Sequence, residues 1–178
     1  MNQEFDVSQP NDTWVTDITY IPTNAGWLYL AGVKDICTCE IVGYAMDRIM
    51  TTELVATAIK QAVKTKRPGR GLLHHSDRGS QYCAHSYRKL LVQLGMISSM
   101  SKKGDCYDNA PMESFWGTLK TELVHHRRYE TRSIVMREIT EFIEIFYNRP
   151  RRHSRLGNIA PATFARQFNQ NGQEKAAE

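Results

Sequence analysis

The order of hydrophobic patterns along the chain is the feature that most restricts its fold. Three segments rich in β-branched and aromatic residues come first, and an alternation of helical and strand patterns follows them. The expected elements, in chain order, are strands at 14–21, 28–33 and 40–46, a helix at 52–66, a strand at 72–76, a helix at 84–94 and a strand at 96–99. The order β-β-β-α-β-α-β predicts an α/β fold that begins with an antiparallel meander.

Two more helices are expected in the last third of the chain. Asn109 or Asp108 can cap a helix whose first turn contains Pro111, where the missing N–H costs nothing. A longer helix at 133–148 has apolar residues on one face, and Pro150 ends it.

Length and composition indicate a single globular domain. The chain has 178 residues, 41% of them apolar, and no apolar run approaches the roughly 20 residues that cross a bilayer. The first residues lack the basic and apolar regions of a secretory signal, so we expect a cytoplasmic protein with no membrane partner. The expected divisions are an N-terminal extension at 1–11, one domain at 12–168 and a disordered tail at 169–178.

Positive charge is concentrated near the end of this domain. The net charge is +4, and residues 146–168 contain five arginines and no Asp or Glu. Such a segment can contact phosphate, and a solvated basic face is the alternative. The five are Arg149, Arg151, Arg152, Arg155 and Arg166.

Three acidic residues are candidates for a catalytic site. Asp17 interrupts an apolar strand, where a carboxylate is costly to bury without a cation or a partner. Asp77 follows a strand, at a position where α/β sheets often place functional groups. Glu113 lies in the first turn of a helix. Each also has a structural alternative, namely an edge hydrogen bond for Asp17, a turn or helix cap for Asp77 and the helix macrodipole for Glu113.

The sequences around these residues are distinctive when they are taken together. The segments WVTDITY, HSDRGSQY and DNAPMESFW surround Asp17, Asp77 and Glu113, and 35 residues separate the last two acids. They resemble the catalytic motifs of OrfB-type transposases of bacterial insertion sequences, whose core is similar to retroviral integrase. Lys120, seven residues after Glu113, matches a basic position of that group. The closing segment also matches, at Tyr147, Asn148, Arg152, His153, Leu156 and Pro161.

The resemblance implies a ribonuclease H-like fold and a metal site. Its sheet is five-stranded and mixed, with three antiparallel strands and then two parallel ones, and helices cover both faces. Asp17 and Asp77 would lie on neighbouring strands with Glu113 above them. Three carboxylates that close resist ionising together, so the site implies a divalent cation, and oxygen-only ligands suit Mg²⁺ or Mn²⁺.

The resemblance also implies the reaction. Two metal ions, held mainly by Asp17 and Asp77 with Glu113 completing the ligands, would promote cleavage at a transposon end and then attack of the freed 3′-hydroxyl on another DNA strand. The implied partners are transposon-end and target DNA, with a homo-multimer assembled on them near the bacterial nucleoid. The candidate DNA contacts are Lys120, Arg149, Arg151, Arg152 and His153.

Two other functions remain open for the sequence. One is a nuclease of the same fold that hydrolyses nucleic acid without joining strands, and the other is an inactive, truncated DNA-binding remnant. The spacing of the acids and Lys120 favour the transposase over the nuclease. Relatives carry a helix-turn-helix region before the catalytic core, and no such pattern precedes Trp14 in this sequence.

Overall fold

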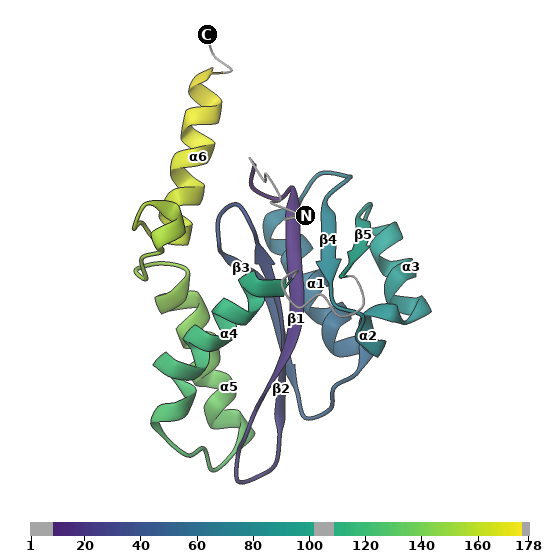
Figure 1. The fold of residues 1–178 in the computed structure, drawn as a ribbon, viewed down its shortest axis with the longest axis vertical. Helices are drawn as coiled ribbons and strands as arrows, with labels where there is room; N and C mark the ends of the chain where they lie inside the picture. The colour runs from purple at the N-terminus through teal and green to yellow at the C-terminus, as the bar shows by residue number, and fades with distance from the viewer. Residues whose placement is uncertain (1–8, 102–108, 176–178) are drawn as a thin grey trace.

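One mixed sheet forms the centre of the molecule (Figure 1). The computed structural model describes residues 9–101 and 109–175, with side chains described as far as residue 171. The strand order is β3-β2-β1-β4-β5. The strands are β1 (Thr13–Ile21), β2 (Leu28–Asp35), β3 (Ile41–Asp47), β4 (Leu73–Ser76) and β5 (Ile97–Met100).

The pairing of the strands confirms the expected sheet. β1 pairs antiparallel with β2, and β2 pairs antiparallel with β3. β4 lies parallel to β1 on its other side, and β5 lies parallel to β4. The meander and the parallel half therefore share β1 as a central strand. The register of β2 and β3 shifts between Val33 and Lys34, where Val42 is the extra residue on β3.

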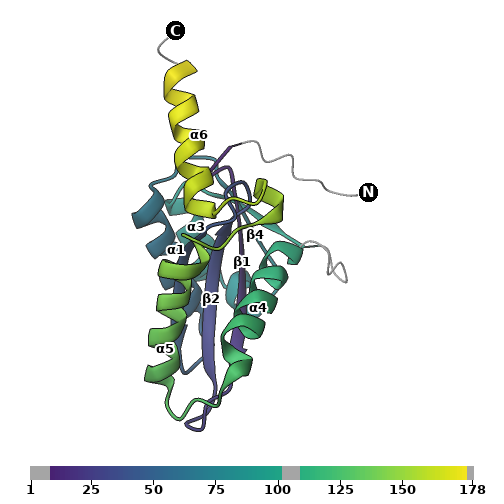
Figure 2. The same ribbon diagram turned by 90° about the vertical axis from the view of Figure 1, so that its left-hand side faces the viewer.

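Helices cover both faces of the sheet, as Figure 2 shows from the side of α4 and α5. One buried cluster lies between the sheet and α4, α5 and η3, and a second lies between the sheet and α1, α2 and α3. The helical elements are α1 (Thr52–Lys66), α2 (Ser80–Cys83), α3 (His85–Gln93), α4 (Ala110–Glu122), η2 (Val124–His126), α5 (Arg132–Glu141), the π-helical η3 (Phe142–Tyr147), η4 (Ser154–Leu156) and α6 (Pro161–Lys175).

The helices differ from the sequence-based expectation in three places. The long helix expected at 133–148 is divided into α5 and the π-helical η3. The short α2 was not expected. α6 was not expected either, and it extends through 169–175, which belong to the segment expected to be a disordered tail. Most of the expected N-terminal extension, residues 1–8, lies outside the described residues, as do 176–178. In the described part of the chain, no helix has the length and hydrophobicity needed to cross a membrane.

Two glycines allow helices to approach the sheet closely. A Cβ atom on Gly43 of β3 would lie 2.5 Å from the carbonyl oxygen of Ala58 in α1. A Cβ atom on Gly32 of β2 would lie 2.8 Å from the ring of Trp116 in α4. Both contacts are too short for a real Cβ, so these positions fix how near each helix layer lies to the sheet.

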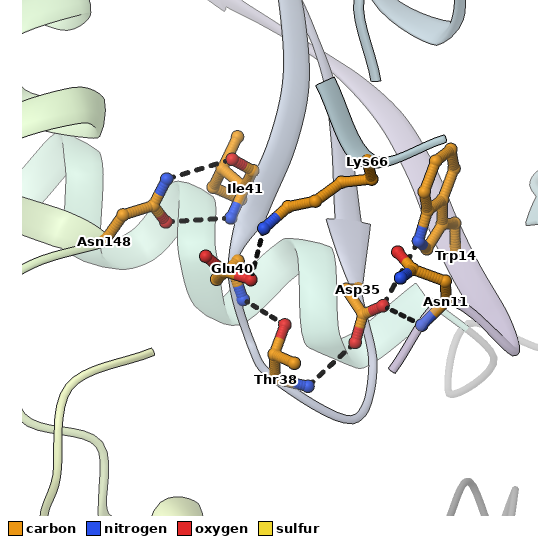
Figure 3. A network of polar contacts seen from close by, with 8 residues as sticks. All are labelled: Asn11, Trp14, Asp35, Thr38, Glu40, Ile41, Lys66 and Asn148. Carbon is orange, nitrogen blue, oxygen red and sulfur yellow. Dashed lines mark hydrogen bonds and ion pairs between the residues drawn. The ribbon is translucent and has the colours of Figure 1, made fainter. Parts of the chain in front are cut away.

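A buried carboxylate organises the turn between β2 and β3 (Figure 3). Asp35 accepts hydrogen bonds from the backbone N–H of Asn11 at 2.6 Å and of Thr38 at 2.7 Å, and from the indole N–H of Trp14 at 3.2 Å. Burial raises the pKa of Asp35, while these bonds act in the opposite direction. The turn is therefore held by one acidic side chain that accepts hydrogen bonds from three N–H groups.

Two side-chain amides form hydrogen bonds with backbone groups of β3, an edge strand of the sheet. Asn148 accepts from the backbone N–H of Ile41 at 2.9 Å and donates to its carbonyl oxygen at 3.0 Å (Figure 3). Further along β3, Gln61 accepts from the backbone N–H of Tyr44 at 2.9 Å. Edge strands with unpaired backbone groups invite pairing with another chain, and these amides block part of that edge.

Lys34 is a buried cation between β2 and α4. Lys34 is 5% exposed, and its Nζ donates a hydrogen bond to the carbonyl oxygen of Pro111 at 3.0 Å. The ammonium also lies 6.0 Å from the centre of the Tyr147 ring. Burial lowers the pKa of Lys34 to about 8, because the charged form loses hydration inside the protein.

We expect Lys34→Met to change the pH dependence of stability. Between pH 8 and 10.5 the unfolded chain keeps a proton on Lys34 that the folded chain has lost, so the wild type gains stability with rising pH. Relative to Lys34→Met, its free energy of unfolding should rise by roughly 3 kcal/mol across this interval. Urea unfolding at several pH values measures the difference. Lys64→Met, at an exposed position in α1, controls for the loss of a surface charge, and a constant difference for Lys34→Met would contradict the expectation.

Candidate functional site

The parallel pairing of β1 and β4 brings two of the predicted acidic residues together. The last residues in register are Thr16 on β1 and Ser76 on β4. Asp17 and Asp77 are the next residues on their segments, so both lie at the point where β4 ends and β1 continues paired with β2 only. This is the carboxyl end of a parallel strand pair, where open α/β sheets bind ligands.

Asp17 interacts with the other two predicted acids and with one indole. Trp116 donates a hydrogen bond from Nε1 to Oδ2 of Asp17 at 3.0 Å. Burial raises the pKa of Asp17 to about 6, and the negative charges of Asp77 and Glu113 contribute to the rise. The three carboxylates are therefore within reach of each other's electric fields, although they come from two strand ends and a helix.

Trp116 is a site residue to which the sequence analysis assigned no function. It lies three residues after Glu113 on α4, so the two residues share one side of the helix. Trp116 is 6% exposed and packs over Gly32, where a side chain would collide with it. The signal in the sequence was a large aromatic residue with a polar N–H, at helical spacing from a predicted site acid.

Asp77 also shapes its own loop. Its Oδ1 accepts a hydrogen bond from the backbone N–H of Gly79 at 2.9 Å, just before α2. Arg78 donates from Nε to the carbonyl oxygen of Ser101 at 2.8 Å, which ties the loop to the end of β5. The turn-forming alternative for Asp77 is thus present, and it uses one carboxylate oxygen. The other oxygen accepts no hydrogen bond from the residues that the structure describes.

Glu113 is exposed in the first turn of α4, which begins at Ala110 after the N-cap residue Asn109. Across residues 9–101 and 109–175, no three His, Cys, Asp or Glu side chains are close enough to hold one metal ion. The three acids consequently share an electrostatic environment but not a closed ligand shell. Carboxylate oxygens that disfavour each other's ionisation fit a hard divalent cation, whose charge would reverse that effect.

Histidines next to the site have structural contacts. His74 is fully buried, and its Nε2 lies 2.9 Å from the Tyr87 hydroxyl. Burial lowers the pKa of His74 to about 4, so it is neutral at pH 7. His75 contacts the hydroxyls of Ser99 at 3.1 Å and Ser101 at 3.2 Å. The contact of His74 joins β4 to α3, and those of His75 link β4 to β5 and to the residue that follows it.

The predicted DNA contacts fall into two groups in the structure. Lys120 is half-buried, with its Nζ 5.4 Å from the centre of the Tyr20 ring. Arg151 forms a two-pronged ion pair with Glu122, at 2.7 Å for the shortest contact. His153 packs edge-on against Tyr147, and its pKa is lowered to about 4, mainly by burial. Arg149 and Arg152 are exposed.

Sequence comparisons assign the chain to a family. Two family models described as "Integrase core domain" match residues 7–106 and 94–161. The chain is 58% identical over 170 residues to the "Insertion element IS600 uncharacterized 31 kDa protein" of Shigella sonnei, covering 96% of this chain and 62% of that protein. It is 45% identical to the transposase for insertion sequence element IS904 of Lactococcus lactis, covering 92% and 65%.

A third relative has the same extent of similarity. The chain is 41% identical to the transposase InsF for insertion sequence IS3A of Escherichia coli, covering 92% of this chain and 57% of that protein. The chain therefore spans about 60% of the length of the curated relatives it matches.

Solved structures share the fold at low sequence identity. The HTLV-2 integrase catalytic core domain in complex with magnesium matches with a TM-score of 0.69 and 12% identity, covering 89% of this chain and 98% of that chain. The catalytic core domain of BIV integrase matches with a TM-score of 0.64 and 17% identity, covering 92% and 99%. Because one family model spans more than half of its residues, and its sheet is that of integrase cores, the chain belongs to the integrase core domain family.

Proposed function

We propose that this chain is the catalytic core of a DNA transposase that cleaves phosphodiester bonds at transposon ends and transfers the freed 3′-hydroxyl to another strand. The observation that carries the proposal is that Asp17 and Asp77 directly follow the last paired residues of β1 and β4, and that the charges of Asp77 and Glu113 both raise the pKa of Asp17. Two relatives named as transposases support it, at 45% and 41% identity.

The three carboxylates are the proposed ligands of two Mg²⁺ or Mn²⁺ ions. Such ions lower the pKa of an attacking water or 3′-hydroxyl and stabilise the leaving oxygen. Asp17 and Asp77 are rigidly mounted, because strand pairing and the N–H donors of Trp116 and Gly79 orient them. Glu113 completes the ligand set from α4, and substrate DNA or metal would draw the first turn of that helix toward the strands.

DNA is the proposed partner, as transposon ends and as target, with a homo-multimer assembled on it. Among the predicted contacts, the exposed Arg149 and Arg152 can meet phosphate without losing an existing ion pair. Lys120, on the helix that carries Glu113, can leave the Tyr20 ring for a phosphate. Arg151 would have to exchange Glu122 for DNA, and the uncharged His153 would contribute a hydrogen bond rather than a charge. The proposed location is the bacterial cytoplasm, at the nucleoid during transposition.

Asp77→Asn should abolish metal-dependent cleavage and joining of labelled duplex and pre-nicked DNA. The change removes the negative charge of a proposed metal ligand. The amide oxygen of Asn can still accept the hydrogen bond from the backbone N–H of Gly79, so the fold should remain. We expect at least a 100-fold loss of product, measured with Mg²⁺ or Mn²⁺ and checked against the melting temperature.

Asp12→Asn is the matched control, because Asp12 is an exposed aspartate just before β1. It should cleave and join like the wild type. Hydrolysis without joined products would favour a nuclease of the same fold. A folded wild type that gave neither product would reject catalysis by this chain alone and favour an inactive remnant.

Trp116→Phe should weaken metal binding while the helix stays packed on Gly32. The substitution keeps an aromatic ring but removes the donor to Asp17, and such supporting bonds typically change metal affinity by about 10- to 100-fold. Calorimetric titration with Mn²⁺ and the metal dependence of cleavage both measure the effect. Trp14→Phe removes the indole donor to Asp35, outside the site, and should lower stability without changing metal affinity. Equal metal affinity for Trp116→Phe and the wild type would contradict the role of Trp116.

A further inference from the structure

A basic groove is lined by residues of α1 and α6 and of the segments that precede β3 and follow η3. Figure 1 shows α6 projecting from one end of the molecule. It has a volume of about 430 Å³, and three separate elements contribute a cation to it. Lys66 comes from the end of α1, Arg149 follows η3, and Arg166 comes from α6. Glu40, in the turn between β2 and β3, is the acidic residue of its lining.

The groove has an excess of positive charge. Lys66 is paired with Glu40 at 2.7 Å, and Glu40 is 8% exposed, so this pair is part of the protein's own structure. The guanidinium of Arg166 donates to the Thr163 hydroxyl at 3.3 Å. Within the described residues, the guanidinium of Arg149 has no hydrogen-bond or ion-pair partner. Two guanidinium groups consequently face solvent without a carboxylate, and guanidinium groups bind phosphate with two parallel donors.

The walls of the groove are fixed to each other. Asn148 binds Ile41 on β3 through its side chain, and its carbonyl oxygen accepts from the backbone N–H of Ala162 in α6 at 2.9 Å. The same residue thus joins the sheet edge to the first turn of α6, with Arg149 next to it in sequence. This anchoring holds the two cationic side chains on opposite elements of one groove.

The chemistry of the groove distinguishes between possible occupants. A partner that adds a β-strand would need the backbone groups of Ile41 and Tyr44, and Asn148 and Gln61 already occupy them. An acidic ligand would meet two guanidinium groups that have no carboxylate partner. Besides Glu40, the nearby carboxylate of Glu144 lines the adjoining pocket and not this groove. The residues around Arg149 and Arg166, from 146 to 168, contain no acid at all.

We propose that Arg149 and Arg166 form a phosphate-binding groove that holds the backbone of duplex DNA away from the carboxylate site. The inference rests on the proposed DNA substrate and adds a second contact surface, with Arg166 as a new member. Two arginines on different elements can each contact a phosphate and read no bases, so the groove would position DNA independently of its sequence.

The test compares DNA binding by the full chain with that of Arg149→Ala/Arg166→Ala. Fluorescence anisotropy with a duplex of about 30 base pairs, in EDTA to prevent cleavage, gives Kd from about 50 to 300 mM salt. Loss of two phosphate contacts should weaken binding roughly 10- to 100-fold near 100 mM salt and make the slope of log affinity against log salt shallower by about 2. Lys66 is left in place, because its removal would leave the buried carboxylate of Glu40 without its ion-pair partner.

Arg88→Ala/Arg137→Ala is the matched control, since it removes the same charge from exposed positions on α3 and α5. It should leave the salt slope unchanged. An unchanged slope in the groove variant, or an equal change in both variants, overturns the groove. Strand joining by the wild type is measured separately. If the wild type joins strands and the groove variant has an unchanged salt slope, only the groove proposal is rejected. If the salt slope becomes shallower in the groove variant alone and the wild type does not join strands, only the proposed catalysis is rejected.

Discussion

The position of α4 on the sheet depends on a hydrogen bond between an indole and a carboxylate. Trp116 reaches Asp17 at 3.0 Å, and Lys34 reaches the carbonyl oxygen of Pro111 at 3.0 Å, one turn earlier on the same helix. The apolar contacts of α4 would tolerate small slides along the sheet, whereas these directional bonds do not. Glu113 lies between these two contacts on α4, so its position relative to β1 follows from them.

The same arrangement buries two ionisable groups, Asp17 and Lys34, where their charged forms lose hydration. Asp17 is ionised less readily than a free aspartate because of burial first and the neighbouring acids second. Lys34 is affected in the opposite sense, as a cation that burial makes easier to deprotonate. Such sites store an electrostatic cost in the folded state, and a bound divalent cation relieves that cost on the acidic side.

Local pattern accounts for most of the fold, and long-range contacts account for what it missed. The five strands and α1 follow from periodicity, and Thr51 caps α1 as its side chain suggests. α6 is polar, and its start is fixed by Asn148, a contact that no local pattern reveals. The three acids were predictable through the family resemblance of their motifs, and their location around β1 follows from the sheet order. The spacing of Trp116 from Glu113 was a signal in the sequence, but its hydrogen bond to Asp17 and the pairing of Arg151 with Glu122 depend on tertiary packing and could not be predicted from local pattern.

The contact between Gly32 and Trp116 couples two positions that are far apart in the sequence. A methyl group at residue 32 would lie 2.8 Å from the indole ring and 2.9 Å from Met112. A larger residue at position 32 would displace the indole ring of Trp116, and with it the donor to Asp17. The residues at positions 32 and 116 should therefore vary together among related proteins. A larger residue at position 32 would require a smaller side chain at position 116 and another hydrogen-bond donor for the carboxylate of Asp17.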